Sequence, residues 1–185
     1  NKIVMRSSKQ KKVAIFDIDG TIFRSSLLIE LVHSLIQERI FKPRAVQVYS
    51  SAHQKWLDRK GGYDAYILAV INAFEKNIVG VKHTDLARIA AKVVAFHKNR
   101  VYRFTRDLVK DLKRKNYYLL AISNSPREIV SAFCKKMGFH KVYGRVYEVS
   151  HQKRFNGNIL YAELIQDKAK ILRLAVKKEN LTLKG

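Results

Sequence analysis

The sequence predicts an α/β fold, with a parallel sheet as its core and a helical segment inserted into that core. Two short apolar runs, residues 13–16 and 117–122, have the length and composition of strands that are covered on both faces. Between these runs, from about residue 25 to 99, the apolar residues recur at helical spacing instead. This order of elements indicates one α/β unit that the helical segment interrupts.

The first strand, expected over residues 13–18, carries the most informative residues of the chain at its exit. Asp17 and Asp19 lie two positions apart, so their carboxylates fall on one side of the exit loop. Gly20 lets the backbone fold closely around a bound group. Because two neighbouring carboxylates repel each other unless a cation or a proton lies between them, we expect a Mg²⁺ site with one carboxylate free for chemistry. The alternative is a polar turn with two solvated aspartates.

Four helices are expected in the inserted segment. They cover about residues 27–41, 45–59, 63–76 and 84–97, with breaks at Pro43, at Gly61-Gly62 and at Gly80. Thr84 is expected to cap the last of them. We interpret the segment as a cap, because it enters the chain directly after the aspartate pair; the alternative is that these helices belong to one mixed core. The aromatic residues of the cap, including Trp56, are expected to serve packing.

A further helix is expected from about Val101, with basic residues along one side and apolar residues along the other. Its apolar side consists of Val101, Phe104, Leu108 and Leu112. The strand at 117–122 follows, and the next helix is expected to begin with a capping box formed by Ser125 and Glu128 and to end at Gly138. The N-terminus of that helix is a natural seat for a phosphate group.

The last part of the chain predicts a β-extension and one more helix. Residues 142–149 have the pattern of a strand, and Asn156-Gly157 has the composition of a two-residue hairpin turn. An amphipathic helix then begins near Lys168. These elements complete the sheet and its cover.

The string Asp-Ile-Asp-Gly-Thr after an apolar run resembles the first motif of the haloacid dehalogenase-like (HAD) superfamily. The second motif of the family, a Ser or Thr at the end of the next core strand, matches Ser123, and its third motif, a Lys at the start of a later helix, matches Lys168. The spacing of these two residues is similar to that of the phosphoserine-phosphatase-like branch. The resemblance implies a Rossmann-like parallel sheet core over residues 1–24 and 100–185, with a helical cap over residues 25–99.

The fourth motif of the family, an acidic pair after a further strand, has no counterpart in the sequence. The helix after Lys168 is followed by Leu-Thr-Leu-Lys-Gly, where the strand that carries the metal-binding acids would begin in this family. We therefore expect a C-terminally incomplete core that lacks its outer acidic metal ligands.

The resemblance implies Mg²⁺-dependent hydrolysis of a small phosphate monoester through an aspartyl-phosphate intermediate. In that chemistry Asp17 is the nucleophile, Asp19 is the general acid and base, and Mg²⁺ binds Asp17 and the backbone carbonyl of Asp19. The phosphate is held by Ser123 and Lys168, together with Thr21 and the backbone amides near Gly20 and Asn124.

The substrate is left open by one departure from the branch. Phosphoserine phosphatases carry a Glu nine residues after the nucleophile, for the amine of the substrate. Here that position is Ser26, and Glu30 lies one helical turn further on. This departure counts against phosphoserine.

The composition supports a second hypothesis. The chain has 37 Lys and Arg against 15 Asp and Glu, a formal net charge of +22, which favours binding to nucleic acid or to anionic lipid. The alternative function is therefore a non-catalytic or degenerate HAD-like domain that binds such a partner, and the simplest explanation of the charge is a solvated, Lys-rich surface. One cysteine, Cys134, fits a reducing, cytoplasmic compartment, and no apolar stretch has the length of a transmembrane segment.

Overall fold

A computed structural model describes residues 10–184, so the predicted core segment 1–24 begins outside the described residues. Its five-stranded sheet has the order β4-β3-β2-β1-β5. The strands are β1 (Lys11–Phe16), β2 (Tyr118–Pro126), β3 (Lys141–Val149), β4 (Phe155–Leu160) and β5 (Leu181–Thr182). All neighbours pair in parallel except β3 and β4, which are antiparallel. The predicted α/β class with a mostly parallel sheet is confirmed.

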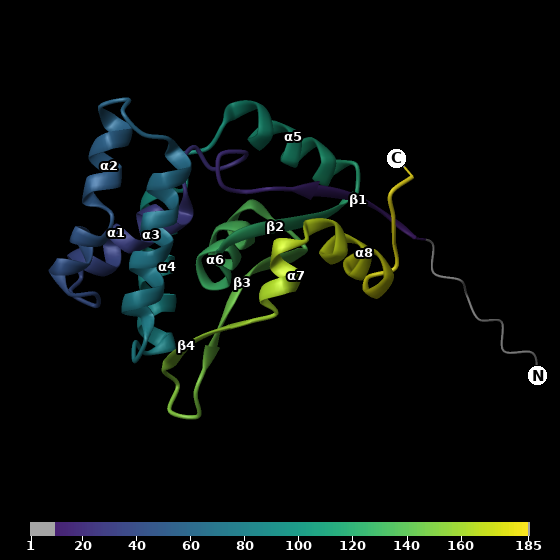
Figure 1. The fold of residues 1–185 in the computed structure, drawn as a ribbon. Helices are drawn as coiled ribbons and strands as arrows, with labels where there is room; N and C mark the ends of the chain where they lie inside the picture. The colour runs from purple at the N-terminus through teal and green to yellow at the C-terminus, as the bar shows by residue number, and fades with distance from the viewer. Residues whose placement is uncertain (1–9, 185) are drawn as a thin grey trace, which may run out of the picture.

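Helices cover both faces of the sheet (Figure 1). They are α5 (Arg103–Arg114), α6 (Arg127–Met137), α7 (Ala162–Gln166) and α8 (Lys168–Lys178). Alternate residues of β2 separate the two sides: Leu119 belongs to the apolar cluster that includes α6, and Leu120 to the cluster that includes α7 and α8. This alternation explains why the strand sequence is apolar throughout.

Strand β1 is not covered on both faces as predicted. Ile15, on the α8 side, is 38% exposed. The short strand β5 pairs only with Lys11 and Lys12, so among the described residues the rest of β1 has β2 as its one neighbour in the sheet. The apolar run of β1 therefore belongs to a strand with one buried face and one partly exposed face.

The inserted segment lies at one end of the sheet, and its helices run side by side (Figure 1). It contains α1 (Leu27–Gln37), the 3-10 helix η1 (Pro43–Val48), α2 (Ser50–Leu57), α3 (Tyr63–Ile78) and α4 (His83–His97). Helices α1 and α4 pack on α6 of the core, and buried residues of both parts, such as Val93 and Phe133, belong to one apolar cluster. The inserted helices therefore share their hydrophobic core with the sheet.

The two ends of the insertion lie beside each other. The N–H of Arg24 donates to the carbonyl of Arg100 at 2.9 Å, and the N–H of Tyr102 donates to the carbonyl of Ile22 at 2.9 Å. Phe23 and Val101 form an antiparallel bridge between these two segments. This pairing of the segments that enter and leave the insertion fixes the position of the insertion relative to the core.

Two predicted helix ends in the insertion are wrong. Helix α1 ends at Gln37 rather than at residue 41, because Arg39 takes a left-handed conformation with φ +57°, and Pro43 then begins η1. Thr84 does not cap α4, which starts at His83. The N–H of His83 donates instead to the carbonyl of Lys153 at 2.9 Å. The turn between β3 and β4 therefore supplies an acceptor for the N-terminus of α4, which a capping side chain was expected to supply.

The β-extension exists, but its turn was predicted at the wrong place. Asn156-Gly157 lies inside β4, and the chain reverses over residues 150–154. Asn156 and Asn158 donate across to the Glu148 carboxylate at 2.6 and 2.8 Å, as cross-strand partners. Gly157 has φ +93°, and a Cβ at this position would lie 2.9 Å from Val79 Cγ2 of the insertion. The glycine marks a close approach of two segments rather than a turn.

Two expectations at the helices of the core have opposite outcomes. Gly138 ends α6 in a left-handed conformation with φ +81°, as predicted. The predicted apolar side of α5 is only partly right: Phe104 is 77% exposed, and Val109 is the buried residue of that helix.

Candidate active site

Asp17 follows the last residue of β1 and forms an ion pair with the first residue of α8. Lys168 Nζ lies 3.1 Å from Asp17 Oδ1, and each side chain is 43% exposed. Helix α8 is fixed at this point because Asp167 caps it, accepting the N–H of Lys170 at 2.9 Å. The structure thus brings together two predicted site residues that are far apart in the sequence.

Asp19 is held by three hydrogen-bond donors from two elements. The N–H of Leu27, at the start of α1, donates to Oδ1 at 2.6 Å. The hydroxyls of Ser123 and Ser125, at the end of β2, donate to Oδ2 at 2.8 and 2.9 Å. The N–H of Ser125 in turn donates to Ser123 Oγ at 3.0 Å. This network orients the carboxylate between the core and the first cap helix.

Burial determines the electrostatics of Asp19. Desolvation is the largest effect and raises the pKa of its carboxyl above the ordinary value, aided by the negative charge of Asp17. The three hydrogen bonds act in the opposite direction but do not outweigh burial. A carboxyl that retains a proton more readily suits a general acid.

The loop that connects the two aspartates to the insertion is a tight turn held by backbone hydrogen bonds. The carbonyl of Ile18 accepts the N–H groups of Thr21, Ile22 and Phe23 at 3.0 to 3.2 Å. Gly20 has φ +74°, a backbone conformation that favours glycine, and no other atom lies within 4 Å of where its Cβ would be. Space for a bound group is therefore open on the Gly20 side of this loop.

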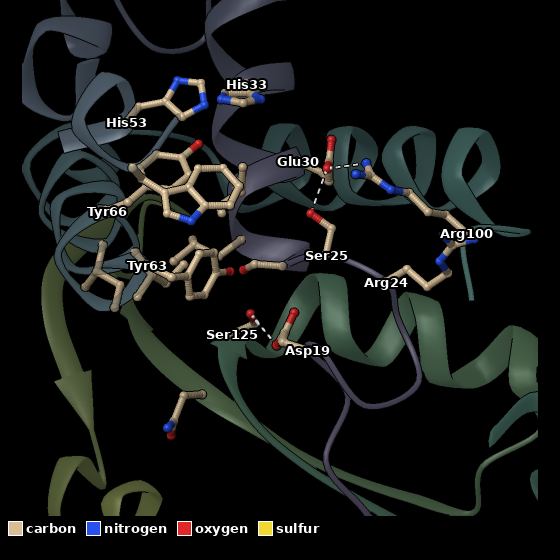
Figure 2. Close-up of a pocket in the computed structure, with 18 of the residues that line it drawn as sticks. Asp19, Arg24, Ser25, Glu30, His33, His53, Tyr63, Tyr66, Arg100 and Ser125 are labelled. Carbon is tan, nitrogen blue, oxygen red and sulfur yellow. Dashed lines mark hydrogen bonds and ion pairs between the residues drawn. The ribbon is translucent and has the colours of Figure 1, made fainter. Parts of the chain in front are cut away.

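A cavity of about 520 Å³ lies between this loop and the inserted helices (Figure 2). The core contributes Asp19, Gly20, Asn124 and Ser125 to its lining. The insertion contributes apolar and aromatic residues together with Glu30, and Arg100 lies where the chain returns to the core. Asp17 and Lys168 are not part of this lining, so of the two aspartates it is Asp19 that faces the cavity.

Ser125 is the functional residue that the sequence reasoning missed. Its hydroxyl binds Asp19 instead of capping α6, and β2 extends through Pro126, which takes the N-cap position without a side-chain hydrogen bond. The predicted capping box is also wrong at Glu128, whose carboxylate is buried with His83 Nε2 at 3.6 Å. The repeat of serines at 123 and 125 was the available signal, because residues two apart on a strand share a face.

Ser123, the predicted phosphate ligand, is fully buried, and its hydroxyl donates to Asp19. Cys134 is buried on α6, and burial raises the pKa of its thiol, as expected of a core residue and not of a nucleophile.

Two oxygen atoms beside the first carboxylate fit a hard cation. Among residues 10–184, no hydrogen bond reaches Asp17 Oδ2 or the carbonyl oxygen of Asp19. In the same part of the chain no group of three or more His, Cys, Asp or Glu side chains could hold a metal ion. The two acceptors therefore suit Mg²⁺ as part of a ligand set, since this ion keeps several waters and binds substrate phosphate.

Comparison with known families decides the class of this site. Residues 14–184 match the family described as haloacid dehalogenase-like hydrolase. The chain belongs to this family. The predicted membership of the HAD superfamily is thereby confirmed, over nearly the whole chain.

Solved structures share the fold of this HAD hydrolase. A phosphoserine phosphatase in the form of a phospho-aspartyl intermediate analogue is 16% identical with a TM-score of 0.55, and the match covers 95% of this chain and 75% of that chain. A protein of unknown function from Bordetella pertussis Tohama I is 11% identical with a TM-score of 0.65, over 95% and 78% of the two chains. A phosphoserine phosphohydrolase-like protein from Francisella tularensis subsp. tularensis SCHU S4 is 13% identical with a TM-score of 0.58, over 92% and 74%.

These likenesses place the HAD hydrolase in a fold group that includes phosphoserine phosphatases.

No curated protein sequence is significantly similar to the chain. Within residues 10–184, none of the helices combines the length and the apolar character that crossing a bilayer requires.

Proposed function

We propose that this HAD hydrolase is a Mg²⁺-dependent phosphatase that cleaves a small phosphate monoester through an aspartyl-phosphate on Asp17. The observation that carries the proposal is the different setting of two carboxylates at one strand exit. Asp17 is exposed and paired with Lys168, whereas Asp19 is held by three donors beside the cavity. The fold of the phosphoserine phosphatases, and the phospho-aspartyl analogue formed by one of them, support the same chemistry.

In the first half of the reaction, an oxygen of Asp17 attacks phosphorus while the ester P–O bond breaks. The proton of Asp19 passes to the leaving oxygen, so an alcohol departs and the phosphoryl group remains on Asp17. Lys168 offsets the negative charge around Asp17. Asp19 lies on the cavity side, which supports the placement of the leaving group there.

In the second half, Asp19 takes a proton from water, and the water oxygen attacks phosphorus. The bond between phosphorus and Asp17 breaks, which releases inorganic phosphate and restores both carboxyl groups. Thr21, Ser123 and the backbone near Gly20 and Asn124 are proposed to hold the phosphoryl oxygens. Ser123 would share its hydroxyl between this role and its bond to Asp19.

Mg²⁺ would be held by the Asp17 carboxylate and the Asp19 carbonyl oxygen. When bound there, it supplies positive charge that compensates the repulsion between Asp17 and the phosphate. Residues 25–99 are proposed to act as the cap that selects the leaving group, because they form most of the cavity wall.

Phosphate release from p-nitrophenyl phosphate, with Mg²⁺ and then with excess EDTA, tests this proposal. We expect turnover that EDTA abolishes. Borohydride added during turnover should reduce the acyl phosphate, and mass spectrometry should then find homoserine at position 17. Turnover without modification of Asp17, or modification of Asp19 instead, would show that the roles are assigned wrongly.

A second candidate function is binding to an anionic membrane surface. It is favoured by residues 96–104, where Phe96 and Phe104 are 83% and 77% exposed and are separated by basic residues such as Lys98 and Arg103. Vesicles with phosphatidylglycerol should bind the protein at low salt and release it at high salt. The double variant Phe96→Ala, Phe104→Ala should bind less. Equal binding of both proteins, or binding only to single-stranded RNA, would contradict a membrane role for this segment.

A further inference from the structure

The wall of the cavity that faces Asp19 is built largely from aromatic side chains of the cap (Figure 2). The rings come from α1, α2 and α3 and converge from residues that are distant in the sequence. They are His33, His53, Trp56, Tyr63 and Tyr66. The sequence reasoning assigned the cap aromatics to packing, and the structure instead places these residues on the cavity.

The rings of this wall divide into a buried support and an exposed surface. Tyr66 is only 2% exposed and its ring packs against both His53, at 4.5 Å between ring centroids, and Trp56, at 5.4 Å. Trp56 and Tyr63 are 38% and 41% exposed, and their rings meet edge to face at 5.6 Å. Tyr66 is therefore used in packing, whereas Trp56 and Tyr63 retain ring surface for a ligand.

The exposed rings lie on the route of the leaving group. Figure 2 shows Tyr63 between Tyr66 and the hydrogen-bonded pair of Asp19 and Ser125. Burial, together with the negative charge of Asp19, raises the pKa of Tyr63, in agreement with this proximity. A leaving group that takes its proton from Asp19 would enter the cavity beside Tyr63 and then reach Trp56.

The Glu30 carboxylate on the cavity is paired within the protein. The Glu30 carboxylate accepts from Arg100 Nη1 at 2.6 Å and from the Ser25 hydroxyl at 3.1 Å, and it has His97 Nε2 at 3.3 Å. A carboxylate paired with an arginine offers less to a substrate ammonium group, since its charge is largely compensated. The cavity thus favours a ring over an amino acid.

We propose that the cavity binds phosphate monoesters whose leaving group carries a flat aromatic ring, stacked on Trp56 and meeting Tyr63 edge to face, as in a nucleoside monophosphate or an aryl phosphate. The substrate class rests on the proposed phosphatase function, but ring binding by the cavity can be measured without it. The cavity volume of about 520 Å³ lies within the usual range of small-molecule sites.

Binding of two matched ligands to the Asp17→Asn protein tests the ring directly. Adenosine 5′-monophosphate and ribose 5-phosphate differ only by the adenine base, and the chain has a single tryptophan, so its fluorescence reports on the cavity. We expect adenosine 5′-monophosphate to quench Trp56 fluorescence in a saturable way, and ribose 5-phosphate to bind roughly 5- to 100-fold more weakly, the range of one ring stacked on an aromatic side chain. Equal affinity for the two ligands overturns the proposal.

Variants of the wall separate stacking from general packing. Calorimetry should show roughly 5- to 100-fold weaker binding of adenosine 5′-monophosphate to Trp56→Ala and Tyr63→Ala, little change for Trp56→Phe, and no change for Leu57→Ala, an exposed neighbour that does not line the cavity. Thermal unfolding checks that each variant is folded. Equal loss in Leu57→Ala and Trp56→Ala would overturn the proposal.

Turnover distinguishes the ring proposal from the phosphatase proposal and identifies the source of the ring. Adenosine 5′-monophosphate and 1-naphthyl phosphate are compared with glycerol 3-phosphate and phosphoserine in the Mg²⁺ assay. Turnover of only the ring-free esters overturns the ring proposal and leaves the phosphatase intact. Ring-dependent binding without turnover of any ester supports the ring proposal and removes the phosphatase.

Discussion

Asp17 and Asp19 are separated by one residue, yet the fold gives them opposite surroundings. Asp17 is exposed, has a cationic partner in Lys168, and keeps one carboxylate oxygen free of hydrogen bonds among the described residues. Asp19 is partly buried, accepts three hydrogen bonds and has a raised pKa. The comparison teaches that the site separates a charged, accessible carboxylate from one that holds a proton, with the roles set by burial and partners.

The largest expected effect tests the exposed member of the pair. Asp17→Asn should lower turnover of p-nitrophenyl phosphate by roughly 10³-fold or more, because an amide cannot accept the phosphoryl group. Thermal unfolding should be almost unchanged, since the side chain is 43% exposed. Asp107→Asn, another exposed carboxylate, is the matched control. Comparable turnover in Asp17→Asn and wild type would mean that the nucleophile lies elsewhere.

The effect of replacing Asp19 should depend on whether the leaving group needs a proton. Asp19→Asn should lower turnover of an alkyl phosphate such as glycerol 3-phosphate by roughly 10²- to 10⁴-fold, the usual contribution of general acid catalysis. For p-nitrophenyl phosphate, whose leaving group needs no proton, the first step should slow much less. Pre-steady-state release of nitrophenol measures that step. Equal losses for both esters would show that Asp19 does not protonate the leaving group.

Lys168 sharpens the comparison because it pairs with the exposed carboxylate alone. Lys168→Met should lower turnover by roughly 10²-fold, since it removes positive charge where the phosphoryl group is held. The free energy of unfolding should change by less than about 1 kcal/mol, as expected of an exposed ion pair. Lys170→Met, on the same helix, should leave turnover unchanged. A large loss of stability with unchanged turnover would make Lys168 a structural residue.

The smallest effect concerns the support of Asp19. Ser125→Ala removes one of its three hydrogen bonds, worth about 1 kcal/mol, and should lower turnover of an alkyl phosphate by a factor of roughly five to ten. The control Ser51→Ala lies on α2, where no side chain is buried. If turnover of p-nitrophenyl phosphate falls as much as that of the alkyl ester, Ser125 acts on the phosphate and not through Asp19.

The order of site residues along the chain was predictable because each follows a simple local signal. Asp17, Asp19 and Gly20 come directly after an apolar run, and Ser123 ends the next one. Carboxyl ends of parallel strands meet at one edge of a sheet, so the approach of Asp19 and Ser123 follows from the fold class. Lys168 depended on the family resemblance, since nothing local distinguishes it from other lysines at helix starts.

Other residues were misread because their role depends on contacts far along the chain. Ser125 has the composition of a helix cap, but its hydroxyl binds Asp19, 106 residues away. Gly157 has the composition of a hairpin turn, but its φ and its approach to Val79 show a packing constraint. In both cases a tertiary contact overrode the local preference of the residue, for a helix cap at Ser125 and for a turn at Gly157.

The sequence by itself determined the α/β class, the two aspartates at a strand exit and the helical nature of the insertion, because hydrophobic periodicity and short motifs are local properties. Only the tertiary structure decided that Asp19 is partly buried and hydrogen-bonded while Asp17 is exposed, and that Trp56 and Tyr63 face the cavity. The physical reason is that burial, pKa and stacking depend on which surfaces meet in space. In this protein those surfaces come from α1, α2, α3 and the end of β2, which no local pattern brings together.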